Sequence, residues 1–445
     1  RRSDSMINTL KSIPGIRSLS RIPWFLGFYH YTLSLLGALW YGFPSRKLLV
    51  IGVTGTKGKT TTCNLIGEIL RSAGFRVGLA TTVNFRIGDR EWANETKQTM
   101  LGRFGLQRLL RDMVREGCTH AIIETSSEGI LQHRHAFIDY RVAVFTNLSP
   151  EHIERHGSFS AYRDAKLKLF RKVSKRKDGV GIYNLDDEAV GEFLGPQITN
   201  QFGYSLGRPK IVSPQTRENL VTSNVEFSDR ETSFEVDGKR FRISLIGEFN
   251  AYNALAALTT AYAVGISWET IRAGLAEAKI VSGRFERIHC GQPFEVVIDY
   301  AHEPKSLEAA YETLKLLKPK RIIGLLGSQG GGRDRGKRGE MGKVAARYAD
   351  YIVLANEDPY DEDPNVILSD IEKGISKGDR LSVLKIVDRR SAIEHALSEA
   401  RPGDAVILTG KGGEVWMCIE NGKKIPWGEE GIVADVIRTR FEQKT

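Results

Sequence analysis

The stretch GVTGTKGKTTT, residues 52–62, has residue types and a spacing that predict phosphate chemistry. It follows an apolar run and opens an amphipathic one, which indicates a strand, a glycine-rich loop and a helix. Glycines let backbone N–H groups close around phosphate oxygens, and a helix N-terminus favours negative charge. In such a loop Lys59 would contact the β- and γ-phosphates and Thr60 would offer a hydroxyl to Mg²⁺. Val53 stands where the full P-loop pattern has its first glycine, yet we predict nucleotide binding over a plain strand-to-helix turn.

Two further polar clusters come directly after predicted strands. Glu124 ends the strand expected at Ala121–Glu124, where a carboxylate can reach a phosphate-bound Mg²⁺; an ordinary strand-end acid is an equal alternative. A second cluster follows the strand expected at Val142–Thr146 and makes Asn147 and His152 candidates for nucleotide or metal contacts. A single histidine is more often structural, so His152 alone carries little weight.

The elements that must position these residues form an α/β pattern from Lys47 onward. Short β-branched runs alternate with longer amphipathic stretches, as in parallel strands joined by helices. The expected strands are Leu48–Val53, Ala121–Glu124, Val142–Thr146, Val296–Asp299, Ile322–Leu326, Tyr351–Ala355 and Ala405–Leu408. The expected helices are Lys59–Ala73, Glu151–Arg171 and Ala251–Val264, and residues 205–245 alternate as a small antiparallel sheet would. We predict an α/β fold with a central domain over residues 47–282 and a C-terminal domain over residues 283–445.

The first 46 residues form an apolar arm. Residues 22–45 contain no Asp, Glu, Lys or Arg, while Arg21, Arg46 and Lys47 flank them. The stretch also holds the interface-favouring residues Trp24, Tyr29, Tyr31, Trp40 and Tyr41. Three interpretations stay open: a helix on a membrane surface, a helix packed on the protein's own core, and a membrane span. A signal peptide is excluded because no small-residue cleavage site follows.

Composition limits the partners and the compartment. The formal net charge of +10 favours anionic partners such as nucleotides and carboxylates. Nucleic acid is not among the expected partners, because the sequence carries no groove-reading or stacking motif. Cys63, Cys118, Cys290 and Cys418 lie far apart, which excludes a disulfide scaffold and a zinc ribbon and indicates a reducing compartment. We expect a cytoplasmic protein, peripheral on the inner face of the membrane if the arm contacts lipid.

The ordered motifs resemble the Mur ligase family, and within it the MurE type, from about Lys47 to the C-terminus. They read TGTKGKTTT, ETSS, TNLSPEHIERHGSFSAYRDAKLKLF, YNLDDE, GEFNAYNALAA, GRFE, DYAHEPKSL, GSQGGGRDRGKRGEMG, NEDPYDEDP and LTGKGGE. The resemblance implies a central P-loop ATPase domain and a C-terminal Rossmann-like ligase domain that close around the substrates. The implied reaction is ATP- and Mg²⁺-dependent. An amino acid is joined to the D-glutamate carboxylate of a muramoyl-peptide cell-wall precursor through an acyl phosphate.

The resemblance also implies roles for individual residues around the nucleotide. Lys59 and Thr60 would hold the ATP phosphates and a first Mg²⁺, Glu124 would bind Mg²⁺, and His152 would bind a second ion. Lys166, which on sequence alone is a solvated helix lysine, matches the lysine that is carbamylated in these enzymes. The remaining nucleotide contacts implied are Gly55, Thr56, Gly58, Thr61, Asn147, Asn250, Asn253, Arg284 and Asp299.

On the substrate side the resemblance implies sugar-peptide and amino-acid contacts at Thr125, Ser126, Ser127, Arg134, His302, Asp358, Tyr360 and Glu414. The family's amino-acid loop usually reads DNPR, and its arginine grips the distal carboxylate of diaminopimelate as a bidentate pair. Tyr360 stands at that position, so lysine or another amino acid becomes a rival of diaminopimelate. Arg333 and Lys337 are candidate carboxylate or phosphate contacts, with solvated loop charges as the alternative.

Two departures keep other functions open. Fewer residues precede the phosphate loop than the family usually carries, so we expect the N-terminal UDP-binding domain to be lacking and the acceptor to be UDP-linked, lipid-linked or different. A folylpolyglutamate-synthetase-like ligase is one alternative, although such enzymes usually read GKGS where this chain reads GKTT. A non-catalytic nucleotide-binding scaffold is another, and the intact set of Lys59, Glu124, His152, Lys166 and Arg284 argues against it.

Overall fold

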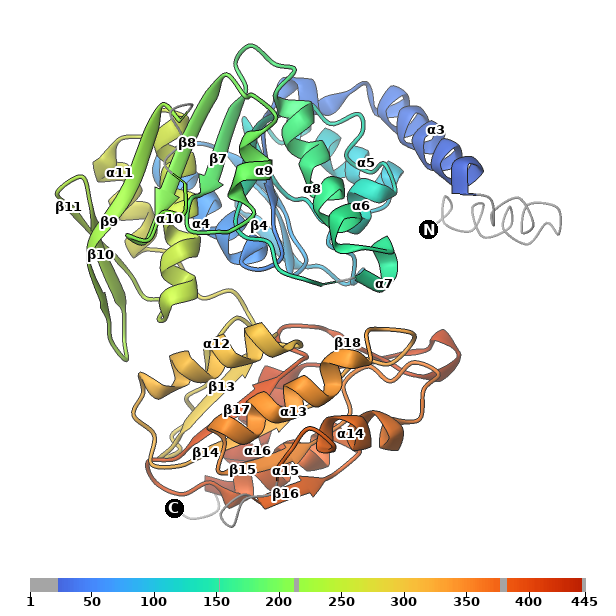
Figure 1. Ribbon diagram of the computed structural model, residues 1–445, viewed down its shortest axis with the longest axis vertical. Helices are drawn as coiled ribbons and strands as arrows, with labels where there is room; N and C mark the ends of the chain where they lie inside the picture. Colours follow the sequence, from blue (N-terminus) through green and yellow to red (C-terminus); the bar gives the residue numbers. More distant parts are fainter. Residues whose placement is uncertain (1–22, 152, 212–215, 377–381, 442–445) are drawn as a thin grey trace.

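The computed structural model describes residues 23–151, 153–211, 216–376 and 382–441. Of the candidate site residues, His152 lies outside them. Two bodies stand one above the other in Figure 1, and the chain passes from the upper to the lower one between α11 (Trp268–Ala276) and β12 (Glu286–Arg287). Each body is built on its own sheet, as the α/β prediction requires.

The upper body holds an 11-stranded sheet in the order β11-β10-β9-β8-β7-β6-β1-β5-β2-β3-β4. The strands are β1 (Leu49–Thr54), β2 (Val77–Ala80), β3 (Asn84–Ile87), β4 (Arg90–Ala93), β5 (His120–Glu124), β6 (Tyr140–Phe145), β7 (Val180–Asn184), β8 (Asn200–Ser205), β9 (Glu218–Phe227), β10 (Thr232–Val236) and β11 (Lys239–Ile243). Strands β2, β5, β1, β6, β7, β8 and β9 pair in parallel, and antiparallel ribbons extend both ends. β1 therefore lies in the middle of the sheet, and the phosphate loop follows its carboxyl end.

Both faces of this sheet are covered, because side chains alternate along each strand. Ile51 and Val53 pack against α4 (Lys59–Ser72), α10 (Glu248–Ala263) and α11. Val50 packs on the opposite face, which is covered by α5 (Arg103–Arg115), α6 (Ser127–Leu131), α8 (Phe159–Val173) and α9 (Val190–Leu194). Burial on both sides explains the nearly continuous apolar runs seen in the sequence.

The continuous helix expected over Glu151–Arg171 is wrong. The structure has a short helix α7 (Ile153–His156) and then α8, separated at Gly157. Gly157 adopts a φ of 80°, a left-handed conformation that glycine tolerates best. The Ser158 side chain then accepts a hydrogen bond from Ala161 N at 3.1 Å and starts a new helix.

The lower body holds a six-stranded sheet in the order β12-β13-β17-β14-β15-β16. Its strands are β12, β13 (Glu295–Asp299), β14 (Ile322–Leu326), β15 (Tyr351–Leu354), β16 (Ser382–Lys385) and β17 (Ala405–Thr409), and β18 (Trp416–Cys418) and β19 (Lys424–Pro426) form a separate ribbon. The helices are α12 (Pro304–Lys315), α13 (Gly336–Tyr348), α14 (Pro364–Glu372), α15 (Arg389–Glu399) and α16 (Glu429–Phe441), with a 3-10 turn η2 (Glu420–Gly422). Helices α12 to α14 cover one face, and α15 and α16 cover the other. This is the Rossmann-like arrangement that the sequence predicts.

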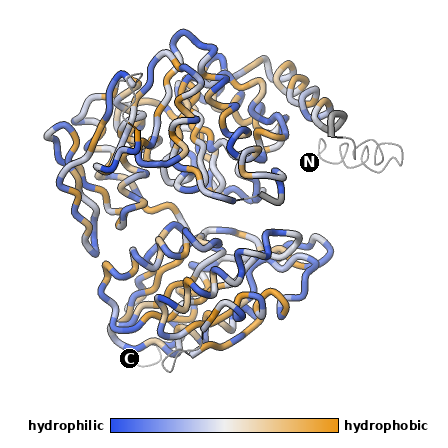
Figure 2. Tube along the Cα trace, viewed as in Figure 1, coloured by the Kyte–Doolittle hydropathy of each residue, from blue (hydrophilic) through white to orange (hydrophobic). Residues whose placement is uncertain are grey.

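The described part of the apolar arm is a helix, α3 (Pro23–Tyr41), followed by a 3-10 turn η1 (Pro44–Lys47). Residues 1–22 of the predicted arm lie outside the described residues. It packs along α5 at the side of the upper body (Figure 1), and Figure 2 shows the apolar colouring that runs along it. Ala38 and Ser34 are buried against the body, whereas Phe28 and Trp40 are exposed. Among the helices of the described residues, none is both long and apolar enough to cross a membrane.

Candidate active site

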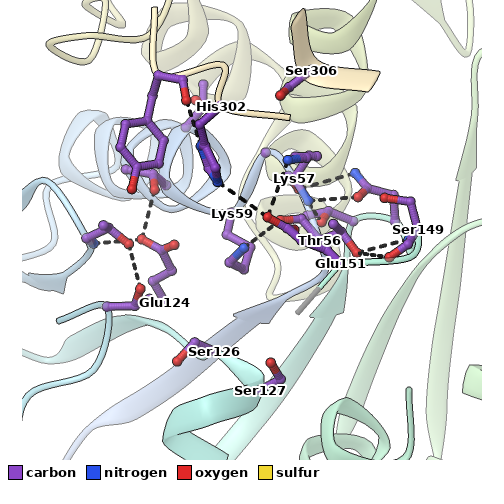
Figure 3. A pocket seen from close by; sticks show the side chains of 18 of the residues that line it. Thr56, Lys57, Lys59, Glu124, Ser126, Ser127, Ser149, Glu151, His302 and Ser306 are labelled. Carbon is purple, nitrogen blue, oxygen red and sulfur yellow. Dashed lines mark hydrogen bonds and ion pairs between the residues drawn. The ribbon is translucent and has the colours of Figure 1, made fainter. Parts of the chain in front are cut away.

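A cavity of about 780 Å³ lies where the two bodies face each other. The upper body lines it with the phosphate loop and with the segments that follow β5 and β6. The lower body lines it with the loops after β13, β14, β15 and β17. Figure 3 looks into this cavity, where His302 of the lower body points toward Lys57 and Thr56 of the upper one. In both sheets these loops follow the carboxyl ends of parallel strands, where ligands of such folds bind.

The phosphate loop has the backbone that its glycines predict. Gly58 is the N-cap of α4 with a φ of 77°, and Gly55 has a φ of 151°. A Cβ at Gly58 would collide with Asn253, and one at Gly55 would collide with Thr146. Glycine is therefore required at both positions. The loop leaves the N-terminus of α4 directed at the cavity, where an anion is favoured.

Thr60 and Glu124 bring a hydroxyl and a carboxylate together beside the loop. Thr60 Oγ1 donates to Glu124 Oε2 at 2.9 Å, and that oxygen also accepts from Thr82 N at 2.8 Å. Both Thr60 and Glu124 are buried. Lys59 Nζ donates to Thr56 O at 2.8 Å and so stays folded over the loop.

This donor set fits Mg²⁺. A hydroxyl and a carboxylate are hard oxygen ligands, and Mg²⁺ in nucleotide sites is held by one or two such groups together with phosphate oxygens. Among the described residues no three His, Cys, Asp or Glu side chains gather as metal ligands. The protein's share of such an ion would thus be small, and Thr60 and Glu124 could provide it.

Lys166 of α8 lies under the loop. Its Nζ donates to Gly55 O at 2.6 Å and sits 4.5 Å from the centre of the Tyr162 ring. Burial lowers the pKa of Lys166 well below its usual range, and the charge of Lys59 adds to this effect. The sequence suggests a solvated helix lysine, whereas the structure gives a buried amine beside the phosphate site.

Contacts between the bodies involve His302, which the resemblance names, together with Lys57, Glu151 and Glu303, which the sequence did not single out. Lys57 pairs with Glu151 at 3.6 Å and also with Glu303 of the lower body. Burial lowers the pKa of Lys57 to about 8. The Nε2 atom of His302 lies 3.5 Å from Glu151 Oε1, and its Nδ1 lies 2.8 Å from Tyr300 O. Burial lowers the pKa of His302 to about 4, so its ring is neutral near pH 7.

The expected nucleotide contacts fall into two groups. Asn147, Asn253, Arg284 and Asp299 line the cavity, and the Arg284 guanidinium lies 4.3 Å from the centre of the Tyr300 ring. Asn250 instead lines a neighbouring cavity of about 300 Å³, although its Oδ1 accepts from Asn253 Nδ2 at 3.2 Å. Asp299 accepts from Phe285 N and Ala301 N, both at 2.7 Å, and burial raises the pKa of Asp299.

The residues expected near the sugar-peptide also separate. Ser126, Ser127 and Arg134 line the cavity. Ser126 caps α6 by accepting from Gly129 N at 3.2 Å. Thr125 is fully buried and donates to Ile123 O at 3.0 Å. Thr125 is not among the residues that line the cavity, because its hydroxyl is turned back to the backbone of β5.

Asp358 and Glu414 line the same cavity, as do Tyr360 and Arg333. Buried Lys411 donates to Asp358 Oδ1 at 2.9 Å and to Glu414 Oε2 at 2.6 Å. Lys97 of the upper body reaches both carboxylates, a contact that no spacing in the sequence signals. The side chain of Lys337 bonds to the backbone, at His302 O, 2.8 Å away.

Comparison with known proteins gives matches over both bodies. Residues 53–261 match the Mur ligase middle domain, and residues 283–412 match the Mur ligase glutamate ligase domain. A UDP-N-acetylmuramoyl-L-alanyl-D-glutamate--2,6-diaminopimelate ligase of Syntrophomonas wolfei is 35% identical over 421 residues, 92% of this chain and 82% of that protein. The ligase of the same name from Geobacillus kaustophilus is 38% identical over 396 residues, 87% of this chain and 79% of that protein.

Solved structures agree. A UDP-N-acetylmuramoyl-L-alanyl-D-glutamate--2,6-diaminopimelate ligase is similar with a TM-score of 0.59 and 31% identity, over 88% of this chain and 79% of that one. The FolC protein of E. coli in complex with DHPP and ADP has a TM-score of 0.64 at 19% identity, over 93% of both chains. The latter likeness concerns the fold alone.

Proposed function

The chain belongs to the Mur ligase family of ATP-dependent, ADP-forming amino-acid ligases, and from this premise we propose that it extends the peptide of a peptidoglycan precursor. The acceptor would be a UDP-muramoyl dipeptide, whose D-glutamate carboxylate is joined to a free amino acid. One observation carries the proposal: the same cavity is lined by the phosphate loop of the upper body and by the acid pair Asp358 and Glu414 of the lower one. An acceptor carboxylate bound in this cavity would have access both to ATP at the phosphate loop and to the amino acid at the acid pair.

The reaction proceeds in two steps. The acceptor carboxylate attacks the γ-phosphorus of ATP, which forms an acyl phosphate and releases ADP. The amine of the amino acid then attacks the acyl carbon through its lone pair, the amide forms, phosphate leaves with its electron pair, and the amine loses a proton. Lys59 and the N-terminus of α4 stabilise the charge on the transferred phosphoryl group. Closure of the two bodies on the bound substrates would exclude the water that hydrolyses an acyl phosphate.

Thr60 and Glu124 would hold Mg²⁺, which when bound neutralises charge on the phosphates. His152 and Lys166, the residues to which the resemblance gives this role, would hold a second ion. For this purpose Lys166 would be carbamylated: its neutral amine adds to the carbon of CO₂ and loses one proton, giving an anionic carbamate. The buried position and lowered pKa of Lys166 support this step, because the neutral amine is the reactive form.

The amino acid added is lysine or diaminopimelate. The names of the relatives favour diaminopimelate. Tyr360, which takes the place of the family's arginine, favours lysine or another amino acid without a distal carboxylate. Arg333, beside Tyr360 in the cavity, is a cation that could compensate.

ADP release and product mass test the proposal. The protein receives Mg²⁺-ATP and UDP-N-acetylmuramoyl-L-Ala-D-Glu with lysine, with meso-diaminopimelate or with no amino acid. We expect turnover only with one of the amino acids and a product heavier by that residue. Turnover with dihydrofolate and glutamate instead, or none in any arm, would contradict the proposal.

We also propose that residues 22–45 hold the enzyme against an anionic membrane surface on the cytoplasmic side. Among the side chains of α3 that the structure describes, five large hydrophobic ones are exposed: Trp40 80%, Phe28 64%, Leu39 56%, Leu36 49% and Tyr31 45%. Basic residues flank this face: Arg46 follows it, and residues 1–21 contain Arg1, Arg2, Lys11, Arg17 and Arg21 against the single acid Asp4. Apolar side chains at the lipid boundary and cations at its headgroups are the features of an interfacial helix.

Vesicle binding tests this second proposal. We expect the protein to sediment with phosphatidylglycerol vesicles more than with phosphatidylcholine vesicles, and the double variant Leu36→Ser, Trp40→Ser to stay in solution with its ATP turnover intact. Val366→Ser removes an exposed apolar side chain from the lower body and serves as the control. Two results would contradict membrane contact. One is a double variant that sediments with the vesicles as much as the wild-type protein does. The other is a wild-type protein that forms a concentration-dependent dimer which the double variant does not form.

A further inference from the structure

Lys97 crosses from the upper body into the acid pair of the lower one. Its Nζ lies 2.8 Å from Asp358 Oδ2 and 2.9 Å from Glu414 Oε2. Lys97 belongs to the segment between β4 and α5 and has a left-handed backbone with a φ of 55°. The indole Nε1 of Trp416 donates to Glu95 O at 3.1 Å and docks the same segment on the ribbon β18–β19.

The acid pair is organised without Lys97. Lys411 bonds to both carboxylates and to Trp416 O, and Asp358 Oδ1 also accepts from Cys418 N at 2.7 Å. Asp358 Oδ2 is left, and among the described residues Lys97 is its partner. Two carboxylates facing one internal ammonium carry a net charge of −1, so the position between Asp358 Oδ2 and Glu414 Oε2 accepts one further ammonium.

An ammonium held there cannot be the nucleophile. The amine that attacks the acyl phosphate needs a free lone pair, whereas a group that donates to two carboxylates keeps its protons. This position therefore suits an amino group that does not react. In the ligase proposed above, such a group exists only on an amino acid with two amino groups.

We propose that Lys97 is an internal stand-in for the substrate: its ammonium occupies the position that the unreactive ammonium of the incoming amino acid takes when it binds. The inference rests on the proposed function. Exchange of one ammonium for another keeps the acid pair neutralised, whereas an amino acid with a neutral or acidic side chain would leave two carboxylates short of a cation. Lys97 thus makes entry conditional on a second positive charge.

The surroundings of Lys97 suit such an exchange. Its side chain is 12% exposed, while that of Asp358 is 1% exposed, so Lys97 can withdraw toward solvent and the carboxylate cannot. The segment also connects to the metal site, because Thr82 Oγ1 donates to Thr99 Oγ1 at 3.0 Å and Thr82 N donates to Glu124. Displacement of Lys97 would therefore move a segment that is hydrogen-bonded, through Thr82, to Glu124.

The variant Lys97→Met tests the exchange. If Lys97 occupies the position in about nine-tenths of the unliganded protein, its removal lowers the KM for the diamino acid by up to about tenfold. The relative rate with amino acids that have one amino group should not improve. Lys97→Arg keeps the charge and should leave the KM at or above its wild-type value. Lys343→Met, which removes an exposed lysine paired with Glu340, is the control.

The outcomes separate the two proposals. No turnover by the wild-type protein would overturn the proposed function. Wild-type turnover with an unchanged or raised KM in Lys97→Met would overturn the stand-in, and a raised KM would instead mean that Lys97 binds the substrate's carboxylate. Should Lys97→Met fail to fold, Trp416→Phe loosens the same segment by removing its hydrogen bond to Glu95, and a lowered KM is again expected.

Discussion

Lys166 donates a hydrogen bond to the carbonyl oxygen of Gly55 at 2.6 Å, from within the upper body and directly beneath the phosphate loop. Burial, with the charge of Lys59 added to it, lowers the pKa of Lys166 well below its usual range and so favours the uncharged amine. An uncharged amine is a nucleophile toward CO₂, whereas the ammonium that an exposed lysine carries at neutral pH is not. The chemistry expected of Lys166 therefore depends on its position under the loop.

The first prediction concerns CO₂. Wild-type turnover should fall when dissolved CO₂ and bicarbonate are removed and recover when bicarbonate is returned. Lys166→Arg should stay inactive in both conditions, since a guanidinium cannot form the carbamate. Intact-protein mass spectrometry of rapidly trapped samples provides the direct measurement. Full wild-type activity without CO₂ would show that Lys166 acts as an amine.

Lys59→Met should lower kcat by about 10²–10³-fold, because the variant loses the cation that faces the transferred phosphoryl group. Thermal unfolding should be nearly unchanged, since within the part of the chain that the structure describes Lys59 bonds to its own loop, at Thr56 O. Steady-state ADP release measures the effect. A loss below tenfold would mean that Lys59 does not face the phosphates.

Glu124→Gln should raise the Mg²⁺ concentration needed for half-maximal activity by at least about tenfold, because a carboxylate ligand becomes a neutral amide. A titration of activity with Mg²⁺ at saturating ATP measures this shift. The matched control is Glu128→Gln, an exposed acid at the edge of the same cavity. Equal Mg²⁺ requirements in both variants would place the ion elsewhere.

The pH dependence of ATP binding should report on Lys57. Its pKa of about 8 is lowered by burial, so Lys57 loses its charge as the pH rises through 8, and the KM for ATP should rise there. For folding the sign is opposite: between about 8 and its ordinary value of 10.5 the unfolded chain binds the extra proton, so this group's contribution to stability increases with pH. Initial rates measured at several ATP concentrations across this pH range should show the rise of the KM for ATP in the wild-type protein. The rise should be absent in Lys57→Met.

Arg389→Met should destabilise the lower body by about 3–5 kcal/mol, because it leaves Glu429 as an unpaired buried charge. Arg389 Nη2 donates to Glu429 Oε1 at 2.7 Å and to Thr409 O at 2.8 Å, with both charged side chains fully buried. Urea unfolding gives the free energy. Arg390→Met, which breaks the exposed pairs of Arg390 with Glu394 and Asp435, should leave the free energy of unfolding nearly unchanged.

The parts of the fold that sequence predicts best are those whose residues have a single role. β14 forms over Ile322–Leu326 as expected, because a short apolar run between helical stretches fits a buried parallel strand. The helix after the phosphate loop begins at Lys59 as expected, because an amphipathic run starts directly after the glycine-rich loop. Strands β7 and β8 were not foreseen, since their runs contain Gly181, Gly203 and several polar residues that become buried only through their neighbours.

Some residues of the candidate site are predicted by local sequence signals, and others are not. Glycines and the residues after strands are local signals, and they place Lys59, Thr60 and Glu124 in the cavity. Lys97 lies 261 positions from Asp358, and no pattern within either segment brings them together. Thr125 is the opposite case. A motif predicts it as a site residue, yet its side chain is fully buried and bonds to the backbone at Ile123 O.

The central claim is that a carboxylate of the acceptor takes a phosphoryl group from ATP before the amide forms. It is tested by an acceptor dipeptide whose reacting D-glutamate carboxylate carries heavy oxygen in both positions. One labelled oxygen should leave in the inorganic phosphate for every amide formed, and the product should gain one amino-acid residue. Phosphate without label, in a reaction that still forms the amide, would contradict it.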